Sequence, residues 1–205
     1  QHGRCGGPRR HCRAPWACHV KSAVLGYALA TIKEIRVSLD LLHPTVQRAV
    51  IEHDLDVEVF PCTHELADTV KFCEHYGFSL TDSANCIILS SRRPKGHFAA
   101  SLVLATHKLD VNKTAKSLMG ASRASFASAE ATIELTAQEI GGVTPFGLPT
   151  DLPIYVDAEI MNRSRIIVGG GNRTTKILCS PETLLRCPQV VVQPSLAIPR
   201  DSEAG

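Results

Sequence analysis

The stretch GGVTPFGLP, residues 141–149, combines three glycines, two prolines and a threonine. Glycine allows positive φ angles and lets a ligand approach the main chain, so the N–H groups of Gly141 and Gly142 can bind an anion or a developing oxyanion. In acyl transfer, removal of one such donor typically costs roughly 3–4 kcal/mol. A second glycine run, 169–171, follows the stretch RIIV, which is apolar after its arginine. We expect both loops to line one cleft, and the alternative is that these glycines only make tight turns.

Motifs for several other chemistries are absent from the sequence. The stretch GGGNRTTK lacks the Gly-Lys-Ser/Thr ending of a phosphate-binding P-loop, and neither a GxSxG elbow nor an HExxH helix occurs. The eight cysteines contain no CxxC pair, and we interpret Cys73 and Cys86 as small core residues. The sequence therefore predicts neither a metal nor another cofactor.

The charged residues are unevenly distributed, although the formal net charge is only +2. Acidic residues gather between 52 and 68, whereas basic residues share the turn at 92–95 and follow the second glycine run. Such a polarised surface can attract RNA phosphates, in binding that weakens steeply with salt. Solvated surface charges are the alternative interpretation. The residues that we assign to RNA binding are Arg92, Arg93, Lys95 and Arg173.

The chain divides into one domain and less regular ends. Residues 1–20 show no hydrophobic period, and their acid-free, Arg-rich composition is typical either of a transit peptide or of a disordered tail. Apolar residues recur every three or four positions from 24 to 42, which predicts an amphipathic helix within 21–42. No run approaches the roughly 18 apolar residues of a membrane span. We expect one domain over 43–192 and a C-terminal tail over 193–205.

Within 43–192, helix and strand patterns alternate without a regular βαβ repeat, which predicts a single mixed-sheet domain of the α/β or α+β class. Pro44, Thr63, Asp110 and Ser128 are expected to begin helices, and two glycines to end them at 77 and 120. The apolar residues expected on the buried side of the last of these helices are Phe126, Ala129, Ile133, Ala137 and Ile140. Strands are expected near LDVEVF, IYVDA, RIIVGG, TKILC and QVVVQ, and NCIILSS and FAASLVLAT are expected to form a hairpin.

Four stretches together resemble one known family: GGVTPFGLP, VDA at 156–158, IIVGGG at 166–171 and LDVNKTAKSLMG at 109–120. Their order and spacing over about 43–190 are similar to the YbaK/EbsC family of aminoacyl-tRNA deacylases, relatives of the editing domain inserted in bacterial prolyl-tRNA synthetases. The resemblance implies a single mixed sheet flanked by helices and a metal-free hydrolysis of the ester between tRNA and a wrong amino acid. In that family, the loop main chain holds the aminoacyl carbonyl, and a ribose hydroxyl or a positioned water assists.

The resemblance also implies roles for individual residues. Gly141 and Gly142 would offer N–H groups, and Thr144 would hydrogen-bond the substrate or the loop. Pro145 would stiffen the loop and Gly147 would let it turn away. Asp157 would anchor a loop rather than act as a general base. The remaining residues expected at the substrate site are Asn85, Phe126, Ile140, Phe146, Gly169 and Gly170.

Two positions depart from the family pattern. Asn85 stands where well-studied members carry a lysine, and Lys176 stands where some carry an aspartate. Our hypothesis is that Lys176 restores the lost cation from the opposite wall of the pocket, in a catalytic role, and meets the terminal phosphate or ribose. The alternative is that Lys176 is a solvated strand residue.

The sequence thus predicts a free-standing trans-editing hydrolase for a small amino acid on tRNA(Pro) or a similar tRNA. Its partners would be aminoacyl-tRNA and an aminoacyl-tRNA synthetase, with neither a membrane nor DNA among them. The expected location is the cytoplasm, or an organelle if residues 1–20 are a transit peptide. One alternative is an inactive module of the same fold that binds tRNA or a synthetase. Another is a hydrolase for a different small ester or thioester.

Overall fold

The structure, a computed structural model, describes residues 39–200, except for the side chain of His64. The expected tail over 1–20 and most of the expected helix over 21–42 lie outside the described residues. The part that is described, Leu39–Leu41, forms one 3-10 turn. No described helix combines the length and apolar composition needed to cross a membrane.

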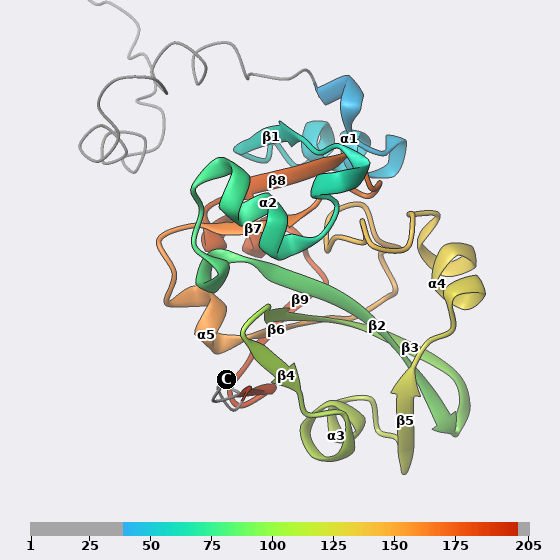
Figure 1. The fold of residues 1–205 in the computed structure, drawn as a ribbon. Coiled ribbons are helices and arrows are strands. Elements are labelled where there is room, and N and C mark those ends of the chain that lie inside the picture. The colour runs from blue at the N-terminus through green and yellow to red at the C-terminus, as the bar shows by residue number, and fades with distance from the viewer. Residues whose placement is uncertain (1–38, 201–205) are drawn as a thin grey trace, which may run out of the picture. The chain divides into compact units, whose positions relative to one another are not determined.

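A five-stranded mixed sheet forms the larger layer (Figure 1). Its strands are β2 (Ala84–Arg93), β3 (Lys95–Leu104), β5 (Arg123–Phe126), β6 (Ile154–Asp157) and β9 (Val190–Gln193), in the order β5-β2-β3-β6-β9. The pairs β5-β2 and β2-β3 are antiparallel, whereas β3-β6 and β6-β9 are parallel. The predicted mixed-sheet fold class and the predicted hairpin are both confirmed.

A second, antiparallel sheet contains β1 (Val57–Pro61), β8 (Thr175–Cys179) and β7 (Ile166–Gly169), in the order β1-β8-β7. A parallel bridge between Ser83 and Ile167 connects it to the beginning of β2. A small pair joins β4 (His107–Leu109) to β10 (Ala197–Pro199). The expected C-terminal tail over 193–205 therefore includes a strand, because Ala197–Pro199 pair with β4 in an antiparallel register.

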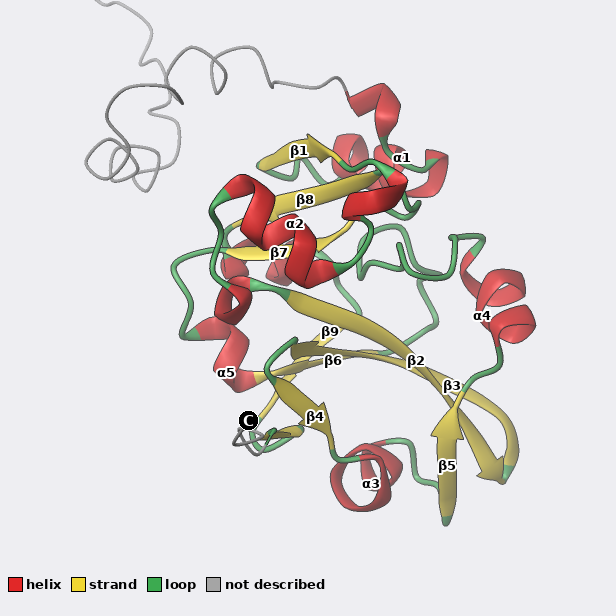
Figure 2. Cartoon of the chain, viewed as in Figure 1, coloured by secondary structure: helices red, strands yellow, loops and turns green. Residues whose placement is uncertain are grey.

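Short helices lie around these sheets (Figure 2). They are α1 (Pro44–Glu52), α2 (Thr69–Tyr76), α3 (Lys116–Leu118, after a π turn over Val111–Ala115), α4 (Ala129–Thr136) and α5 (Ala158–Met161), with further 3-10 helices at His64–Leu66, Leu80–Asp82 and Pro181–Arg186. Pro44 lies in the first turn of α1, and Asp110 and Ser128 cap their helices as predicted. The predicted cap at Thr63 is wrong, because Asp68 accepts the N–H groups of Val70 and Lys71 at the start of α2.

The main core lies between the two larger sheets. Side chains of the five-stranded sheet, such as Ile88 and Leu102, share one apolar cluster with Val59 and Ile177 of the three-stranded sheet. The prediction of a buried apolar side for α4 is wrong. Phe126, Ile133 and Ile140 are 60%, 49% and 41% exposed, and the buried residues of α4 are Thr132 and Thr136. The helix ends at Thr136 because Ala137 adopts a left-handed conformation, so its periodicity does not continue to Ile140.

Candidate functional site

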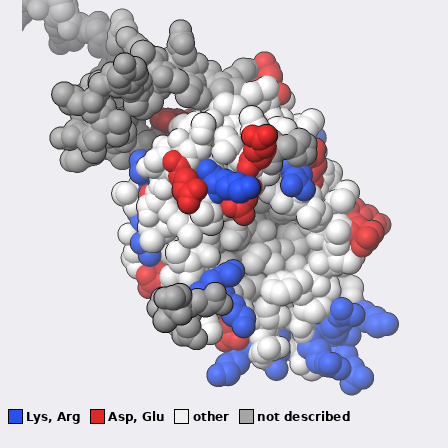
Figure 3. Space-filling model, viewed as in Figure 1, with Lys and Arg blue, Asp and Glu red and all other residues white. Residues whose placement is uncertain are grey.

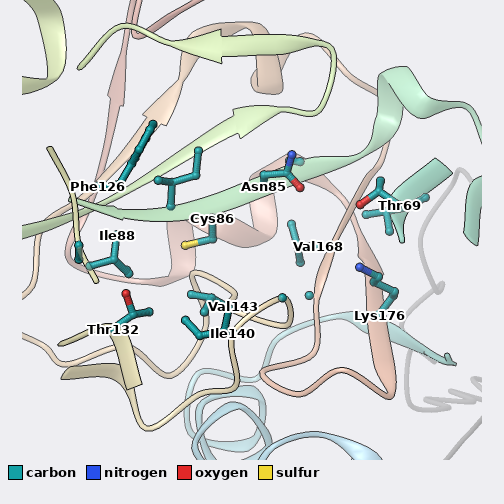
Figure 4. Close-up of a pocket in the computed structure, with 16 residues that line it drawn as sticks. Thr69, Asn85, Cys86, Ile88, Phe126, Thr132, Ile140, Val143, Val168 and Lys176 are labelled. Atoms are coloured by element: carbon teal, nitrogen blue, oxygen red, sulfur yellow. The ribbon is translucent and has the colours of Figure 1, made fainter. Parts of the chain in front are cut away.

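A pocket of about 270 Å³ lies beside the first glycine loop (Figure 4). Its walls come from the first half of β2, the end of β5 with the residue that follows it, the loop after α4, the end of β7, and single residues of α2, α4 and β8. The lining residues are Thr69, Ala84, Asn85, Cys86, Ile87, Ile88, Phe126, Ala127, Thr132, Ile140, Gly141, Val143, Ile167, Val168, Gly169 and Lys176. The structure thus brings together both predicted glycine loops, Asn85 and Lys176.

The first glycine loop places main-chain donors at this pocket. Gly141 and Val143 both line it, and within residues 39–200 their N–H groups have no hydrogen-bond acceptor. Gly141 has φ +87, a conformation that L side chains rarely adopt. The N–H of Gly142, which was expected to face the substrate, instead donates to the carbonyl of Glu139 at 2.9 Å. The two open donors are therefore those of Gly141 and Val143.

Gly142 is required for the contact between the two glycine loops. A Cβ on Gly142 would lie 2.1 Å from the carbonyl oxygen of Asn172, and its own carbonyl accepts the N–H of Gly171 at 2.8 Å. A Cβ on Gly169 would lie 2.2 Å from the carbonyl oxygen of Gly142. Only glycine fits such close main-chain packing. Gly142 and Gly169 thus hold the two loops against each other.

The second glycine run contributes unequally to the pocket. Gly169 lines the pocket, but Gly170 does not. The N–H of Gly170 donates to the carbonyl of Thr175, and its carbonyl accepts the N–H of His43. Gly170 was expected to bind substrate, but its polar groups are used to join β8 to the start of α1.

Three further loop residues are packed behind the pocket rather than in its lining. Thr144, Pro145 and Phe146 are buried, and Phe146 belongs to the main apolar core. The Thr144 hydroxyl has no hydrogen-bond partner among the described residues, and Thr144 does not line the pocket. Gly147 turns the chain with φ +73, where a Cβ would lie 2.4 Å from the carbonyl oxygen of Thr45. These residues therefore support the conformation of the loop and do not line the pocket.

Gln138 holds this loop and was not singled out from the sequence. Its side-chain oxygen accepts the N–H of Thr144, and its side-chain nitrogen donates to the carbonyl of Phe146, both at 2.8 Å. Gln138 is only 1% exposed. Because buried polar groups must be hydrogen-bonded, the paired bonds fix the distance across the loop. No local sequence signal marks this glutamine, since its partners lie six and eight residues away.

Lys176 and Asn85 lie at the same end of the pocket. Lys176, on β8, is 9% exposed, and Figure 4 shows its amine turned into the space that Thr69 also lines. Burial lowers the pKa of Lys176, while the charges of Cys62, Cys73 and Asp68 act in the opposite direction. Lys176 makes no ion pair or side-chain hydrogen bond within the described part of the chain. The interpretation of Lys176 as a solvated strand residue is therefore wrong.

Asp157 lies away from the pocket, at the end of β6. Its buried carboxylate accepts the N–H of Glu159 at 2.9 Å, which caps α5, and the N–H of Ala197 at 2.7 Å. Asp157 therefore anchors the segment that leads to β10. The expected anchoring role applies to this C-terminal segment and not to the glycine loop.

The residues assigned to RNA binding occupy two places. Arg92, Arg93 and Lys95 are exposed at the turn between β2 and β3, and the Arg92 Nε donates to the Ser125 Oγ at 2.8 Å. Figure 3 shows Lys and Arg side chains gathered at this corner of the molecule. Arg173 lies elsewhere, with its Cγ and Nε 4.0 Å from the position of a Cβ on Gly141.

These features define a class of α/β domain in which a glycine-rich loop and a sheet enclose a small pocket, and solved structures share this fold. The hypothetical protein APE2540 is 22% identical with a TM-score of 0.67, over 75% of this chain and 99% of that one. A protein described as a candidate trans-editing enzyme for prolyl tRNA synthetase is 24% identical with a TM-score of 0.66, over 75% and 97%.

The sequence comparisons identify the family. The uncharacterized protein YwhH of Bacillus subtilis (strain 168) is 31% identical over 118 residues, which cover 58% of this chain and 73% of YwhH. The sequence pattern of the aminoacyl-tRNA editing domain matches residues 63–187. The chain therefore belongs to the aminoacyl-tRNA editing domain family, which confirms the resemblance seen in the sequence.

Proposed function

We propose that this protein is a trans-editing deacylase, which hydrolyses the ester between a small, wrongly attached amino acid and tRNA(Pro) or a similar tRNA. The observation that carries this proposal is the pair of open N–H donors, Gly141 and Val143, at a small pocket. Membership of the editing-domain family supports the reaction class. The similarity in fold to a candidate trans-editing enzyme for prolyl tRNA synthetase favours tRNA(Pro) as the first substrate to test.

The proposed step is attack of a water oxygen on the ester carbonyl carbon. The N–H groups of Gly141 and Val143 stabilise the oxyanion that forms, because their positions are set before the reaction. The bond from this carbon to the ribose oxygen then breaks. The amino acid leaves as its carboxylic acid, and the departing ribose oxygen gains a proton that comes from the water. The neighbouring ribose hydroxyl assists the proton transfer.

The lining residues favour this substrate-assisted route over catalysis by a side chain. The described lining contains neither an acidic residue nor a histidine, and its titratable members are Cys86 and Lys176. Burial raises the pKa of the Cys86 thiol to about 12. A nucleophilic cysteine requires a lowered pKa, so Cys86 is unsuited to covalent catalysis. The pocket volume of about 270 Å³ is sufficient for an aminoacyl group.

The test is a panel of Ala-, Cys-, Ser- and Thr-tRNA(Pro), incubated with the full chain and followed by loss of the ester against uncatalysed hydrolysis. Selective turnover of one or more members is the expected result. If all members decay at the background rate while tRNA still binds, the chain is a binding module and the proposal fails. Turnover of a small ester or thioester without tRNA would instead assign a hydrolase of another class.

A further inference from the structure

The two ends of the pocket differ in chemistry. One end is mainly apolar and is lined by Cys86, Ile88, Val143 and Phe126, with Thr132 as its polar member. The other end is lined by Thr69, Asn85 and Lys176 (Figure 4). The open donors of Gly141 and Val143 belong to the loop beside these walls. A ligand carbonyl held by this loop would therefore have one substituent directed to each end.

Lys176 lacks an acceptor at its end of the pocket. It is about nine-tenths buried, and no described acidic residue lies within ion-pair distance of its amine. Asp68 acts on Lys176 through its charge, but its carboxylate accepts the N–H groups of Val70 and Lys71. The Lys176 amine is not among the fully buried atoms without a partner, so it is accessible from the pocket that it lines, and a largely desolvated cation there favours a hydrogen-bond acceptor. A ligand oxygen at this position would satisfy it.

Exposed apolar side chains mark one accessible side of the pocket, whereas Lys176 is largely buried and its neighbours Thr69 and Asn85 are partly exposed. Phe126 and Ile140 are 60% and 41% exposed, while Lys176 is 9% exposed. Phe126 ends β5, and the other end of β5 pairs Arg123 with Arg93, beside the basic turn. A tRNA carries its phosphates outside the pocket, so it would approach from the Phe126 side. Lys176 is therefore poorly placed for the terminal phosphate that the sequence suggested as its partner.

We propose that Lys176 and Thr69 form a specificity subsite that binds an oxygen acceptor in the side chain of the aminoacyl group. The preferred substrates are then aminoacyl-tRNAs with a small oxygen-bearing side chain, either a hydroxyl or a carboxylate. This inference rests on the proposed deacylase function and specifies its substrate class. Thr69 adds a hydroxyl that both donates to and accepts from such an oxygen.

The test compares kcat/KM for seryl-, aspartyl- and alanyl-esters on the same tRNA. We expect the unmodified protein to prefer the seryl or the aspartyl ester over the alanyl ester by at least tenfold. A preference for the seryl ester would identify a hydroxyl as the group bound by the subsite, and a preference for the aspartyl ester a carboxylate. Lys176→Met should lower the preferred kcat/KM at least tenfold more than the alanyl value. Lys176→Arg should retain part of the preference. Lys71→Met, on an exposed face of α2, is the matched control and should change neither value.

Two results would overturn the subsite. One is a preference for the alanyl ester in the unmodified protein. The other is an equal loss on all three esters in Lys176→Met, which would place Lys176 against the ribose or phosphate that they share. If no ester is hydrolysed, the proposed function fails, and the subsite is tested by binding of non-hydrolysable seryl-, aspartyl- and alanyl-amide analogues of the tRNA 3′ end. Equal affinities there would also overturn it.

Discussion

The side chain of Gln138 accepts the N–H of Thr144 at 2.8 Å and so spans the base of the glycine loop. Its amide nitrogen donates to the carbonyl of Phe146, so one side chain satisfies a donor and an acceptor of the buried main chain. The open donors of Gly141 and Val143 lie within the segment that Gln138 closes. Their positions thus depend on a residue outside the pocket lining.

Gln138→Leu should therefore reduce both stability and deacylation. The substitution leaves the Thr144 N–H and the Phe146 carbonyl buried without partners, at about 1–3 kcal/mol for each group. Urea unfolding should show a loss of about 2–6 kcal/mol for the two groups together, and kcat/KM should fall at 15 °C, where the protein is still folded. Gln138→Glu keeps the side-chain oxygen that accepts the Thr144 N–H but removes the amide nitrogen that donates to the Phe146 carbonyl, so it should retain only the first hydrogen bond. An unchanged kcat/KM in folded Gln138→Leu would exclude a positioning role.

Gly141→Ala tests whether the loop donors serve the reaction. Gly141 has φ +87 and Gly96 has φ +90, and neither position has an atom closer than 4.0 Å to an added Cβ. Alanine should thus cost a similar roughly 1–2 kcal/mol at both positions. Only Gly141→Ala should lower kcat/KM, by at least tenfold, since Gly96 lies near the start of β3 and does not line the pocket. Similar kinetics for the two variants would argue against a donor at Gly141.

Arg93→Gln together with Lys95→Gln should weaken tRNA binding. Each phosphate contact contributes roughly 0.7–0.9 to the slope of log affinity against log salt. Loss of both charges should reduce that slope by about 1–2, as measured by fluorescence anisotropy between 50 and 200 mM salt. The control is Lys71→Gln, on exposed α2, which should leave the slope unchanged. A slope that does not respond to the double substitution would place the tRNA elsewhere.

Asp157→Ala should act on stability and not on catalysis. It removes the cap of α5 and the acceptor for the Ala197 N–H, which together should cost about 1–3 kcal/mol. Hydrogen exchange at Ala197 should increase, because β10 loses its connection to β6. We expect kcat/KM of the folded fraction to stay within about twofold. A large loss of kcat/KM without faster hydrogen exchange at Ala197 would indicate that Asp157 acts at the substrate site after all.

Stability should decrease as the pH rises above 9, because of the buried thiols. Burial raises the pKa of Cys86 from 9.0 to about 12 and that of Cys187 to about 11. Between those values the unfolded chain loses thiol protons that the folded chain keeps, so each thiol contributes a slope of up to about 1.4 kcal/mol per pH unit against folding. The pKa of Lys176 is lowered from 10.5 by burial, so the folded chain loses this proton at a lower pH than the unfolded chain does. Lys176 therefore increases stability as the pH rises toward 10.5, opposite to the thiols.

Urea unfolding of the unmodified protein and Cys86→Ala at pH 8, 9 and 10 measures this effect. The unmodified protein should lose stability more steeply above pH 9 than Cys86→Ala does. Parallel curves for the two proteins would mean that the Cys86 thiol ionises equally in the folded and unfolded states.

Local patterns in the sequence were sufficient for much of the fold. Two apolar runs joined by a short basic turn with a proline and a glycine predicted the β2–β3 hairpin. Pro44, Asp110 and Ser128 mark helix starts because their effects act within one turn. The position of the α2 cap was wrong, because Asp68 competes with Thr63 for the same role only five residues later. The buried side of α4 was wrong as well, since the left-handed Ala137 interrupts the period.

The sequence alone also determined the family and the loop that carries the candidate chemistry, since glycines and prolines at fixed spacing constrain the main chain locally. Only the tertiary structure decided which donors of that loop are open. The Gly142 N–H donates to the carbonyl of Glu139, whereas the N–H groups of Gly141 and Val143 have no acceptor within residues 39–200. Both residues line a pocket whose other walls come from distant strands. Likewise, the burial of Lys176 depends on contacts between segments that are far apart in the sequence. The hydrogen bonds of Gln138 depend on how the glycine loop closes on itself. Such contacts leave no periodic signal, because packing rather than local propensity selects them.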